Sequence, residues 1–266
     1  MTLPTLFVPH GGGPCFFMDP DGGPPDPMWQ PMERYLAGLI DSLPERPRAI
    51  LLVSGHWEED DITVHTGTRP DLLFDYYGFP EHTYHLRWDA PGAPDVARRT
   101  ASLLRGAGFA TREENTRGWD HGVFIPMKVA VPGADIPLAQ MSLRADLDPA
   151  DHIAIGRALA PLRDEGVLIV GSGMSFHNLR ARGSMAVAPS AEWDAALTEA
   201  VTDPDPARRA ERVAGWRTLP HAQFAHPREE HLLPLMVALG AGGDAAAVRD
   251  HSSNVLGWAV SGYRFG

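Results

Sequence analysis

The stretch Ala49-Ile50-Leu51-Leu52-Val53-Ser54-Gly55-His56-Trp57 decides how this chain folds. It opens with five apolar residues, most of them branched, which is the pattern of a strand buried on both faces of a sheet. The apolar run stops at Ser54-Gly55-His56. Because ligands of open α/β sheets bind beyond the carboxyl ends of the strands, His56 stands where a functional site is expected.

The same design occurs twice more along the chain. Residues 6–9 form an apolar run that leads into His10 and a glycine triplet, and residues 167–170 lead into Gly171-Ser172-Gly173 and then His177. A histidine therefore follows each of three apolar strands, at or shortly past the carboxyl end of the strand. This arrangement predicts a histidine-rich site along one edge of a sheet.

Strand patterns alternate with helical patterns over the whole length. Strands are expected at 5–9, 49–54, 62–65, 136–143, 167–170 and 257–265. Helices are expected at 29–43, 94–106, from Gly122 to about Val129, at 149–165, two or three times between 190 and 216, and at 229–239. This order predicts an α/β fold: one domain, residues 1–266, with a central mixed, mainly parallel sheet flanked by helices on both faces.

The composition of the chain indicates which classes of partner are not expected. The 266 residues carry a formal net charge of -11, which argues against nucleic acid and anionic membrane as partners. Cys15 is the one cysteine, so no intrachain disulfide can form, and a reducing cytoplasm is the expected location. We expect a monomer or a homodimer that binds a small molecule.

Histidines at equivalent strand ends suggest a metal site. Two imidazoles and one further donor can hold a divalent ion and leave positions open for substrate. The third donor is expected in the segment 226–235, where both Glu230 and His231 are candidates. The alternative for each residue by itself is a hydrogen-bonded structural role, and for the acids a helix-capping turn.

Two other motifs in the chain are incomplete. The segment His10-Gly11-Gly12-Gly13 could form the oxyanion hole of an esterase, but the nearest G-x-S-x-G motif, at 173–177, ends in histidine. Gly171-Ser172-Gly173 begins like a dinucleotide-binding loop, but Phe176 stands where the third glycine is needed. Both patterns are weaker than the metal site.

A long connection, residues 67–93, contains the aromatic segment 74–80. Loops of this length are usually functional or disordered, and the aromatic density favours a cap over a pocket, formed by Tyr76, Tyr77 and Phe79. The alternative, that these rings only pin the loop to the core, stays open. The pocket is expected to be lined by residues 10–13, 54–57, 171–177 and 226–231, with Gly12, Trp57 and His226 contacting substrate.

Six short motifs in a fixed order carry a family resemblance. They are Val8-Pro9-His10-Gly11-Gly12, Val53-Ser54-Gly55-His56-Trp57, Asp75-Tyr76-Tyr77-Gly78-Phe79-Pro80, Asp120-His121-Gly122, Gly171-Ser172-Gly173 with His177-Asn178-Leu179, and His226-Pro227 with Glu230-His231-Leu232-Leu233-Pro234-Leu235. Together they span nearly the whole chain. In these motifs the chain resembles the class III extradiol ring-cleavage dioxygenases, and among them the DOPA 4,5-dioxygenase-like branch.

The resemblance implies roles for five histidines. His10, His56 and His231 would hold the metal, His177 would be the acid/base residue, and His121 would contact substrate. The best-known class III enzymes supply a glutamate as third ligand, so Glu230 remains an alternative to His231. Two histidines and a carboxylate suit Fe(II), whereas three histidines equally suit Zn(II).

The reaction implied by the resemblance is cleavage of a catechol ring with O₂ at one divalent metal, with Fe(II) favoured and Zn(II) possible. A DOPA-like or related catechol is the expected substrate. Two alternatives use the same histidines: a zinc-dependent hydrolase and a noncatalytic metal-binding protein of the same fold. Retention of His177 disfavours the second, because a scaffold needs no base beside its metal.

Overall fold

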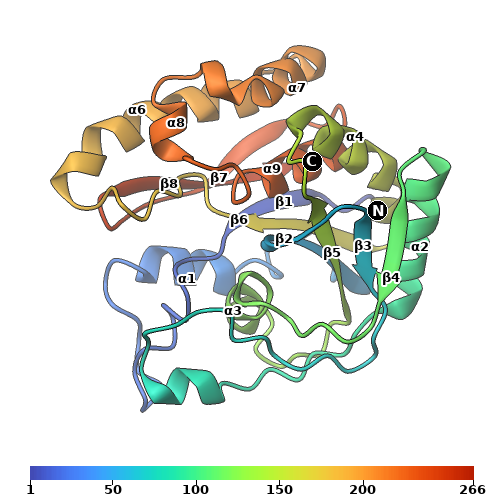
Figure 1. The fold of residues 1–266 in the computed structure, drawn as a ribbon, viewed down its shortest axis with the longest axis horizontal. Helices are drawn as coiled ribbons and strands as arrows, with labels where there is room; N and C mark the ends of the chain where they lie inside the picture. Colours follow the sequence, from blue (N-terminus) through green and yellow to red (C-terminus); the bar gives the residue numbers. More distant parts are fainter.

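A single eight-stranded sheet forms the centre of the computed structural model, which describes residues 1–266 (Figure 1). Its strands lie in the order β4-β3-β5-β2-β6-β1-β8-β7. Their bounds are β1 Thr5–Pro9, β2 Ala49–Glu59, β3 Ile62–His65, β4 Thr111–Glu114, β5 Leu138–Arg144, β6 Val167–Gly173, β7 Ala247–Val255 and β8 Trp258–Phe265.

The four central strands, β5, β2, β6 and β1, run parallel to one another. Antiparallel pairs occur only towards the edges, where β3 pairs with β5, β8 with β1, and β7 with β8. The predicted mixed, mainly parallel sheet is therefore confirmed. The apolar strands β1 and β6 are buried along their whole length, as expected for strands covered on both faces.

Strand register fixes the position of the site. Pro9 of β1 lies opposite Gly173 of β6, and Ser54 of β2 lies opposite Ser172. The parallel strands β1 and β6 therefore end at the same level, whereas β2, expected to end at Ser54, continues to Glu59 with an irregularity in its pairing between Val53 and Glu58. His10 and His56, which follow these paired residues, are brought together at this edge of the sheet.

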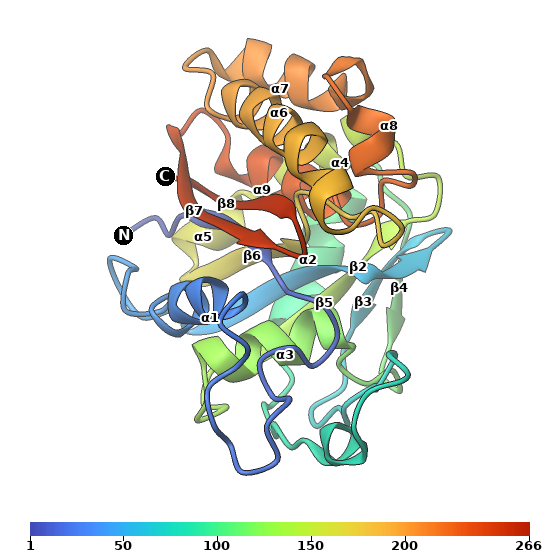
Figure 2. The same cartoon turned by 90° about the vertical axis from the view of Figure 1, so that its left-hand side faces the viewer.

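Helices cover both faces of the sheet (Figures 1 and 2). On one face α4 and α9 pack together, α9 lies on β6 and β1, and α6 lies on β8; α3 covers β2 on the other face and contacts α1. The bounds are α1 Gln30–Ala37, α2 Pro94–Gly106, α3 His121–Ala130, α4 Pro149–Leu159, α5 Pro161–Asp164, α6 Ser184–Val201, α7 Pro206–Ala214, α8 Ala222–Ala225 and α9 Leu233–Gly242, with 3-10 turns η1 Glu81–His85 and η2 Trp216–Thr218.

Several elements differ from the expected ones. The edge strands β4 and β7 were not predicted, because their sequences are rich in charged or polar residues and lack a buried apolar run. The expected helix 149–165 is broken at Pro161, which has no backbone N–H to continue it. The expected helix 29–43 ends at Ala37 and continues only as turns.

The expected helix 229–239 begins later, at Leu233 with Pro234 in its first turn. Glu230 and His231 therefore lie in the turn that precedes α9, not inside a helical turn. This irregular backbone can approach the strand ends more closely than a helix could.

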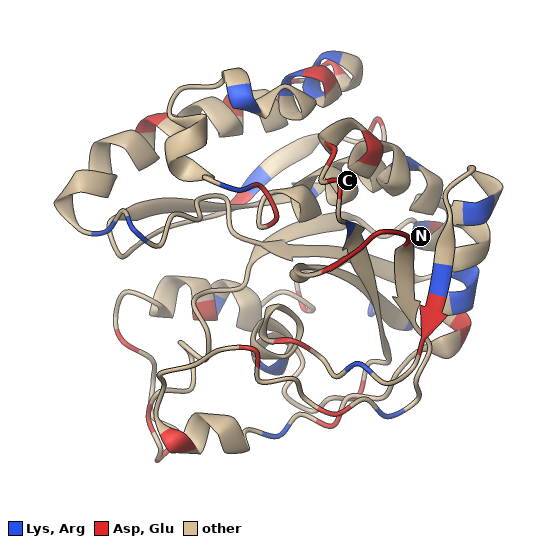
Figure 3. Ribbon diagram, viewed as in Figure 1, with Lys and Arg blue, Asp and Glu red and all other residues tan.

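Charged residues lie mainly at the periphery (Figure 3). The charged residues of α2 and α7 are mainly arginines, and Arg99 of α2 pairs with Glu165 while Arg212 of α7 pairs with Glu199. None of the helices combines the length and apolar character needed to span a membrane.

Candidate metal centre

Three histidines meet at one edge of the sheet: His10 follows β1, His56 lies within β2, and His231 lies in the turn before α9. The Nε2 atom of His56 lies 3.3 Å from Nε2 of His10 and 3.2 Å from Nε2 of His231. Two nitrogens bound to one ion at roughly 2.0–2.1 Å, at angles of 90–110°, lie about 2.8–3.4 Å apart. Both distances from His56 therefore suit nitrogens bound to one divalent ion.

These three imidazoles are in the neutral form that binds metal. Burial lowers the pKa of His56 to about 3, and it also holds the pKa values of His10 and His231 well below the ordinary value. The neighbouring imidazoles add to the effect in each case. A neutral ring keeps a lone pair available for coordination, so no proton has to leave before a metal binds.

The other ring nitrogen of each histidine faces an oxygen. Nδ1 of His10 lies 3.1 Å from the hydroxyl of Ser172, and Nδ1 of His231 lies 2.8 Å from Oε1 of Glu230. Nδ1 of His56 lies 3.5 Å from Oδ2 of Asp75. Metal-binding histidines typically donate from their second nitrogen to such groups, which fixes the ring and leaves Nε2 for the ion.

Glycines allow the turn before α9 to lie against the strand ends. A Cβ atom at Gly173 would sit 2.1 Å from the carbonyl oxygen of His231, and one at Gly55 would sit 3.0 Å from that of Glu230. The backbone N–H of Met174 also donates to the His231 carbonyl at 3.0 Å. The glycines at the end of β6 and within β2 thus allow His231 to lie close to His56.

Two further histidines flank the three. His121, the first residue of α3, lies with its ring centre 3.9 Å from that of His56, and His177 stacks on His231 at 3.5 Å. Potential ligand atoms fall into two separate groups, one of His10, His56 and His121 and the other of His177, Glu230 and His231, each within 4.8 Å. The short Nε2 distances from His56 join these groups into one centre.

Asp120 links the start of α3, which carries His121, to Ser54 of β2. Its buried carboxylate accepts hydrogen bonds from Ser54 at 2.7 Å and from Gln140 at 2.5 Å, and Arg117 lies 3.2 Å away. The hydroxyl of Ser54 also accepts the backbone N–H of His56 at 3.1 Å. Asp120 of the Asp120-His121-Gly122 motif therefore has a structural role, because it holds α3 against the strand that carries His56.

Asp75 is the residue that sequence reasoning missed. Its Oδ1 atom accepts both the backbone N–H of His121 at 2.9 Å and its ring Nδ1 at 2.7 Å, while Oδ2 faces His56. Burial alone would raise the pKa of this carboxyl, but its contacts with the two histidines keep the pKa below its ordinary value. The only signal in the sequence was its place at the head of the aromatic segment.

The residues expected to contact substrate divide into two sets. Tyr76 lies with its ring centre 5.8 Å from that of His121, and Phe79 packs against Tyr76 and over Gly13. Gly12, which precedes Gly13 in the loop after β1, is exposed and lies next to the indole of Trp29.

The remaining three are not brought to the cluster. Tyr77 points into solvent, with 91% of the residue exposed. Trp57 follows His56 on the strand and faces the other way, where its indole donates to Glu59 and lies under Arg117. His226 is fully buried between Trp193 and Trp216 and faces the carbonyl of Ser175.

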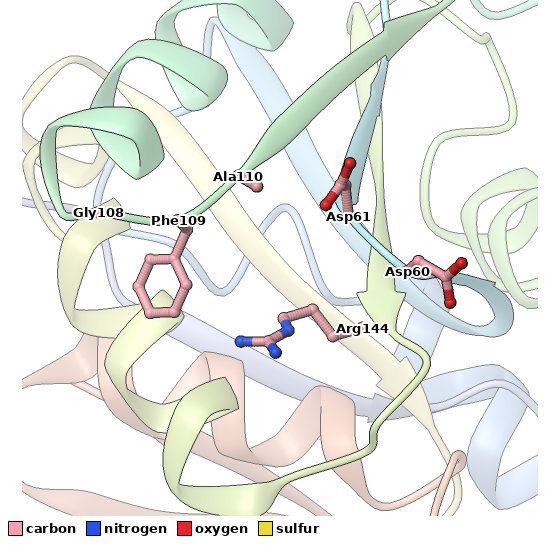
Figure 4. Close-up of a pocket in the computed structure, with 6 residues that line it drawn as sticks. All are labelled: Asp60, Asp61, Gly108, Phe109, Ala110 and Arg144. Carbon is pink, nitrogen blue, oxygen red and sulfur yellow. The ribbon is translucent and has the colours of Figure 1, made fainter.

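Two surface hollows lie away from the histidines. One, of about 160 Å³, is bounded by Asp60, Asp61, Gly108, Phe109, Ala110 and Arg144 (Figure 4). Arg144 already pairs with Asp146 and Asp151, so this hollow has no free cation for an anionic ligand. The other, of about 370 Å³, is formed by residues 70–89 of the long connection. Neither contains a group of metal donors, so the histidine cluster is the candidate site.

Comparison with known proteins identifies the family. Residues 4–266 match the family described as the catalytic LigB subunit of aromatic ring-opening dioxygenase. The chain belongs to the LigB family. It is a metal-dependent extradiol dioxygenase, which opens the aromatic ring of a catechol-type substrate with O₂. The predicted resemblance and the predicted class of reaction are confirmed.

Named relatives agree with this assignment. Dioxygenase tasH of Hapsidospora irregularis is 40% identical, in an alignment covering 99% of this chain and 85% of that protein. The 4,5-DOPA dioxygenase extradiol of Beta vulgaris is 38% identical over 90% of this chain and 87% of its own length. A crystal structure of an uncharacterized protein from Escherichia coli K12 matches with a TM-score of 0.79 at 27% identity, covering 99% of this chain and 100% of that one.

Membership of the LigB family decides between the alternatives raised by the sequence. A zinc-dependent hydrolase and a noncatalytic metal-binding protein would use the same histidines. The match of nearly the whole chain to a ring-opening family favours oxidative ring cleavage over both.

Proposed function

We propose that His10, His56 and His231 hold one divalent ion, and that this ion is Fe(II) during ring cleavage. The convergence of their Nε2 atoms, at 3.2 and 3.3 Å from His56, is the observation that carries the proposal. Three neutral nitrogen donors leave further positions for two catechol oxygens and O₂. A bound divalent ion would favour the deprotonated form of a catechol hydroxyl and supply the chemistry of oxygen.

Glu230 has a supporting role in this proposal and is not the third ligand. Its Oε1 atom lies 2.8 Å from Nδ1 of His231 and 3.5 Å from Nδ1 of His177. A carboxylate that accepts from a ligand histidine orients the ring and makes it a better donor to the metal. Glu230 would lose this contact if it turned to coordinate the ion itself.

His177 is proposed as the acid/base residue. Its ring lies parallel to that of His231, at 17°, and 21% of its side chain is exposed. It therefore stands beside the proposed ion on the open side, within reach of a bound catechol. Histidine is suited to accept a hydroxyl proton near neutral pH and to return one later.

The proposed substrate is a DOPA-like or related catechol. Several relatives named 4,5-DOPA dioxygenase extradiol support a catechol with an amino-acid side chain. Within the chain, His121 would contact the substrate, and Tyr76 and Phe79 would border the ring and exclude water. All these groups come from one chain, so a monomer or a homodimer would carry the complete site, and we infer a reducing, cytoplasmic setting.

The test is anaerobic reconstitution with Fe(II), followed by O₂ uptake on a panel of catechols that includes DOPA. We expect one Fe(II) per chain and O₂ consumption with formation of a ring-opened product. Replacement of His10, His56 or His231 by Ala should remove most of the bound metal and the activity. His85→Ala is the matched control, because His85 is exposed in the long connection.

Retention of Fe(II) in all three ligand variants would contradict the proposed site. Zinc-loaded protein that opens the ring as fast as the Fe(II) form would contradict the proposed metal. An O₂-independent reaction of the catechols would contradict the proposed chemistry.

A further inference from the structure

We propose that Asp75 is a positioning residue for ring cleavage, which fixes His121 and His56 in the tautomer and orientation that the reaction needs. The proposal rests on the function proposed above. It adds a carboxylate from the long connection to a site whose other parts come from β2, the segments after β1 and β6, the start of α3 and the turn before α9.

Asp75 is placed to act on both histidines at once. Its Oδ1 atom accepts two hydrogen bonds from His121, and its Oδ2 atom lies 3.5 Å from Nδ1 of His56. The residue as a whole is exposed, but only 21% of its side chain is, because the carboxylate turns inward. A solvated surface aspartate would have no reason to adopt this orientation.

A carboxylate imposes one arrangement of protons on its neighbours. An ionised aspartate can only accept hydrogen bonds, so an imidazole bonded to it through Nδ1 must carry its proton there. Nε2 of His121 is then left with its lone pair. In this form His121 accepts a hydrogen bond or proton from a substrate hydroxyl, and His56 presents its Nε2 to the metal.

The backbone around Asp75 is held in register with His121. Leu73 N–H donates to the carbonyl of Trp119 at 2.7 Å, and Trp119 N–H donates to the carbonyl of Asp71 at 2.8 Å. The aromatic neighbour Tyr76 is anchored through its hydroxyl to the carbonyl of Thr83 at 2.6 Å. Asp75 therefore reaches His121 from a segment fixed on both sides, which is what a positioning role requires.

Asparagine cannot replace this carboxylate. If the amide oxygen introduced by Asp75→Asn kept the bonds to His121, the amide N–H₂ would face Nδ1–H of His56, and two donors cannot bond to each other. If the amide turned round, His121 would lose its acceptor instead. The substitution therefore nearly preserves the side-chain volume but must disturb one of the two rings.

The test measures tautomers and turnover in the same proteins. Nitrogen NMR of ¹⁵N-histidine protein, metal-free and zinc-loaded, should show His121 protonated at Nδ1 and not at Nε2. In Asp75→Asn at least one of the two rings should change its tautomer. Ring cleavage with saturating Fe(II) should fall about 10–100-fold, the usual effect of losing such a partner. Asp89→Asn, an exposed aspartate of the same connection, should change neither quantity.

Protonation of His121 at Nε2 in the wild-type protein would overturn the proposal without any variant. Unchanged tautomers and unchanged turnover in Asp75→Asn would also overturn it. Failure of the proposed function is distinguishable, because it would show as an inactive wild type, or as metal bound elsewhere, while the His121 tautomer could still be read. A well-folded Asp75→Glu variant that regains the Nδ1–H signal and part of the turnover would support positioning by the carboxylate.

Discussion

Two carboxylates support the histidine cluster from different parts of the chain. The Asp75 arm consists of Asp75, His56 and His121, and the Glu230 arm consists of Glu230, His231 and His177. Each carboxylate faces one proposed metal ligand and one further histidine. The arms differ in which histidine receives the short bond.

In the Glu230 arm the short bond, 2.8 Å, goes to the proposed ligand His231, and the 3.5 Å contact goes to His177. In the Asp75 arm the short bond, 2.7 Å, goes to His121, and the 3.5 Å contact goes to the proposed ligand His56. The inverted pattern implies a division of labour. In the proposed site Glu230 would mainly support the metal ligand His231, whereas Asp75 would mainly support His121, the proposed substrate contact.

The arms also differ in how the chain builds them. Glu230 and His231 are sequence neighbours in one turn, so their pairing is local. Asp75 lies 46 residues from His121 and reaches it only because the long connection folds back along residues 119–121. The Asp75 arm should therefore respond to changes in loop packing that leave the Glu230 arm untouched.

Among the changes that compare the two arms, the largest expected effect on turnover comes from His177→Ala. If His177 serves as the acid/base residue and not as a ligand, the variant should keep its metal and still bind a catechol. Ring cleavage should fall by roughly 10²–10⁴-fold, the scale of a lost acid/base group. Metal content, catechol binding and turnover are measured on the same sample. Loss of metal would make His177 a ligand, and unchanged turnover would remove it from the mechanism.

The two carboxylates should differ in their effect on metal affinity. Glu230→Ala leaves Nδ1 of His231 without its acceptor and should weaken metal binding about 10–100-fold in a chelator competition. Asp75→Ala should weaken it less, since its contact with His56 is the longer one. Glu229→Ala is the control, because Glu229 pairs with Arg217. Equal losses of metal affinity in Glu230→Ala and Asp75→Ala would contradict the proposed difference between the two carboxylates.

The smallest effect should come from Tyr76→Phe. The change deletes the hydrogen bond to the carbonyl of Thr83, a buried residue, and should cost about 1–3 kcal/mol of stability. At about 2–4 °C per kcal/mol, thermal unfolding should detect it. Turnover should fall by a small factor while metal affinity stays the same. Tyr77→Phe, at a residue that is 91% exposed, should alter nothing. A drop in metal affinity for Tyr76→Phe would show that the loop also positions the proposed ligand His56 through Asp75.

The sequence predicted the elements in which local pattern and burial agree. The strands β1 and β3 and the helix α2 have the expected bounds, because an apolar run, or a proline start with a glycine end, marks them. The position of His10 at the end of β1 was predicted for the same reason, whereas β2 continues past His56 to Glu59. The edge strands β4 and β7 were not, since polar edge residues carry no core pattern.

Site residues that act through distant contacts could not be predicted from local patterns. The sequence shows Asp75 only as one acid within an aromatic segment, and its partner His121 lies 46 residues further along the chain. Trp57 and His226 were expected at the pocket because they adjoin site residues in sequence. Strand alternation turns Trp57 away, and the packing of Trp193 and Trp216 encloses His226.

The most direct test of the central claim is an anaerobic crystal structure of the Fe(II)-loaded protein with anomalous data at the iron edge. We expect one iron peak bonded to Nε2 of His10, His56 and His231 at roughly 2.0–2.2 Å. His177, His121 and both carboxylates should lie outside bonding distance. An iron peak bonded to Glu230 or His177 in place of one of the three histidines would contradict the account.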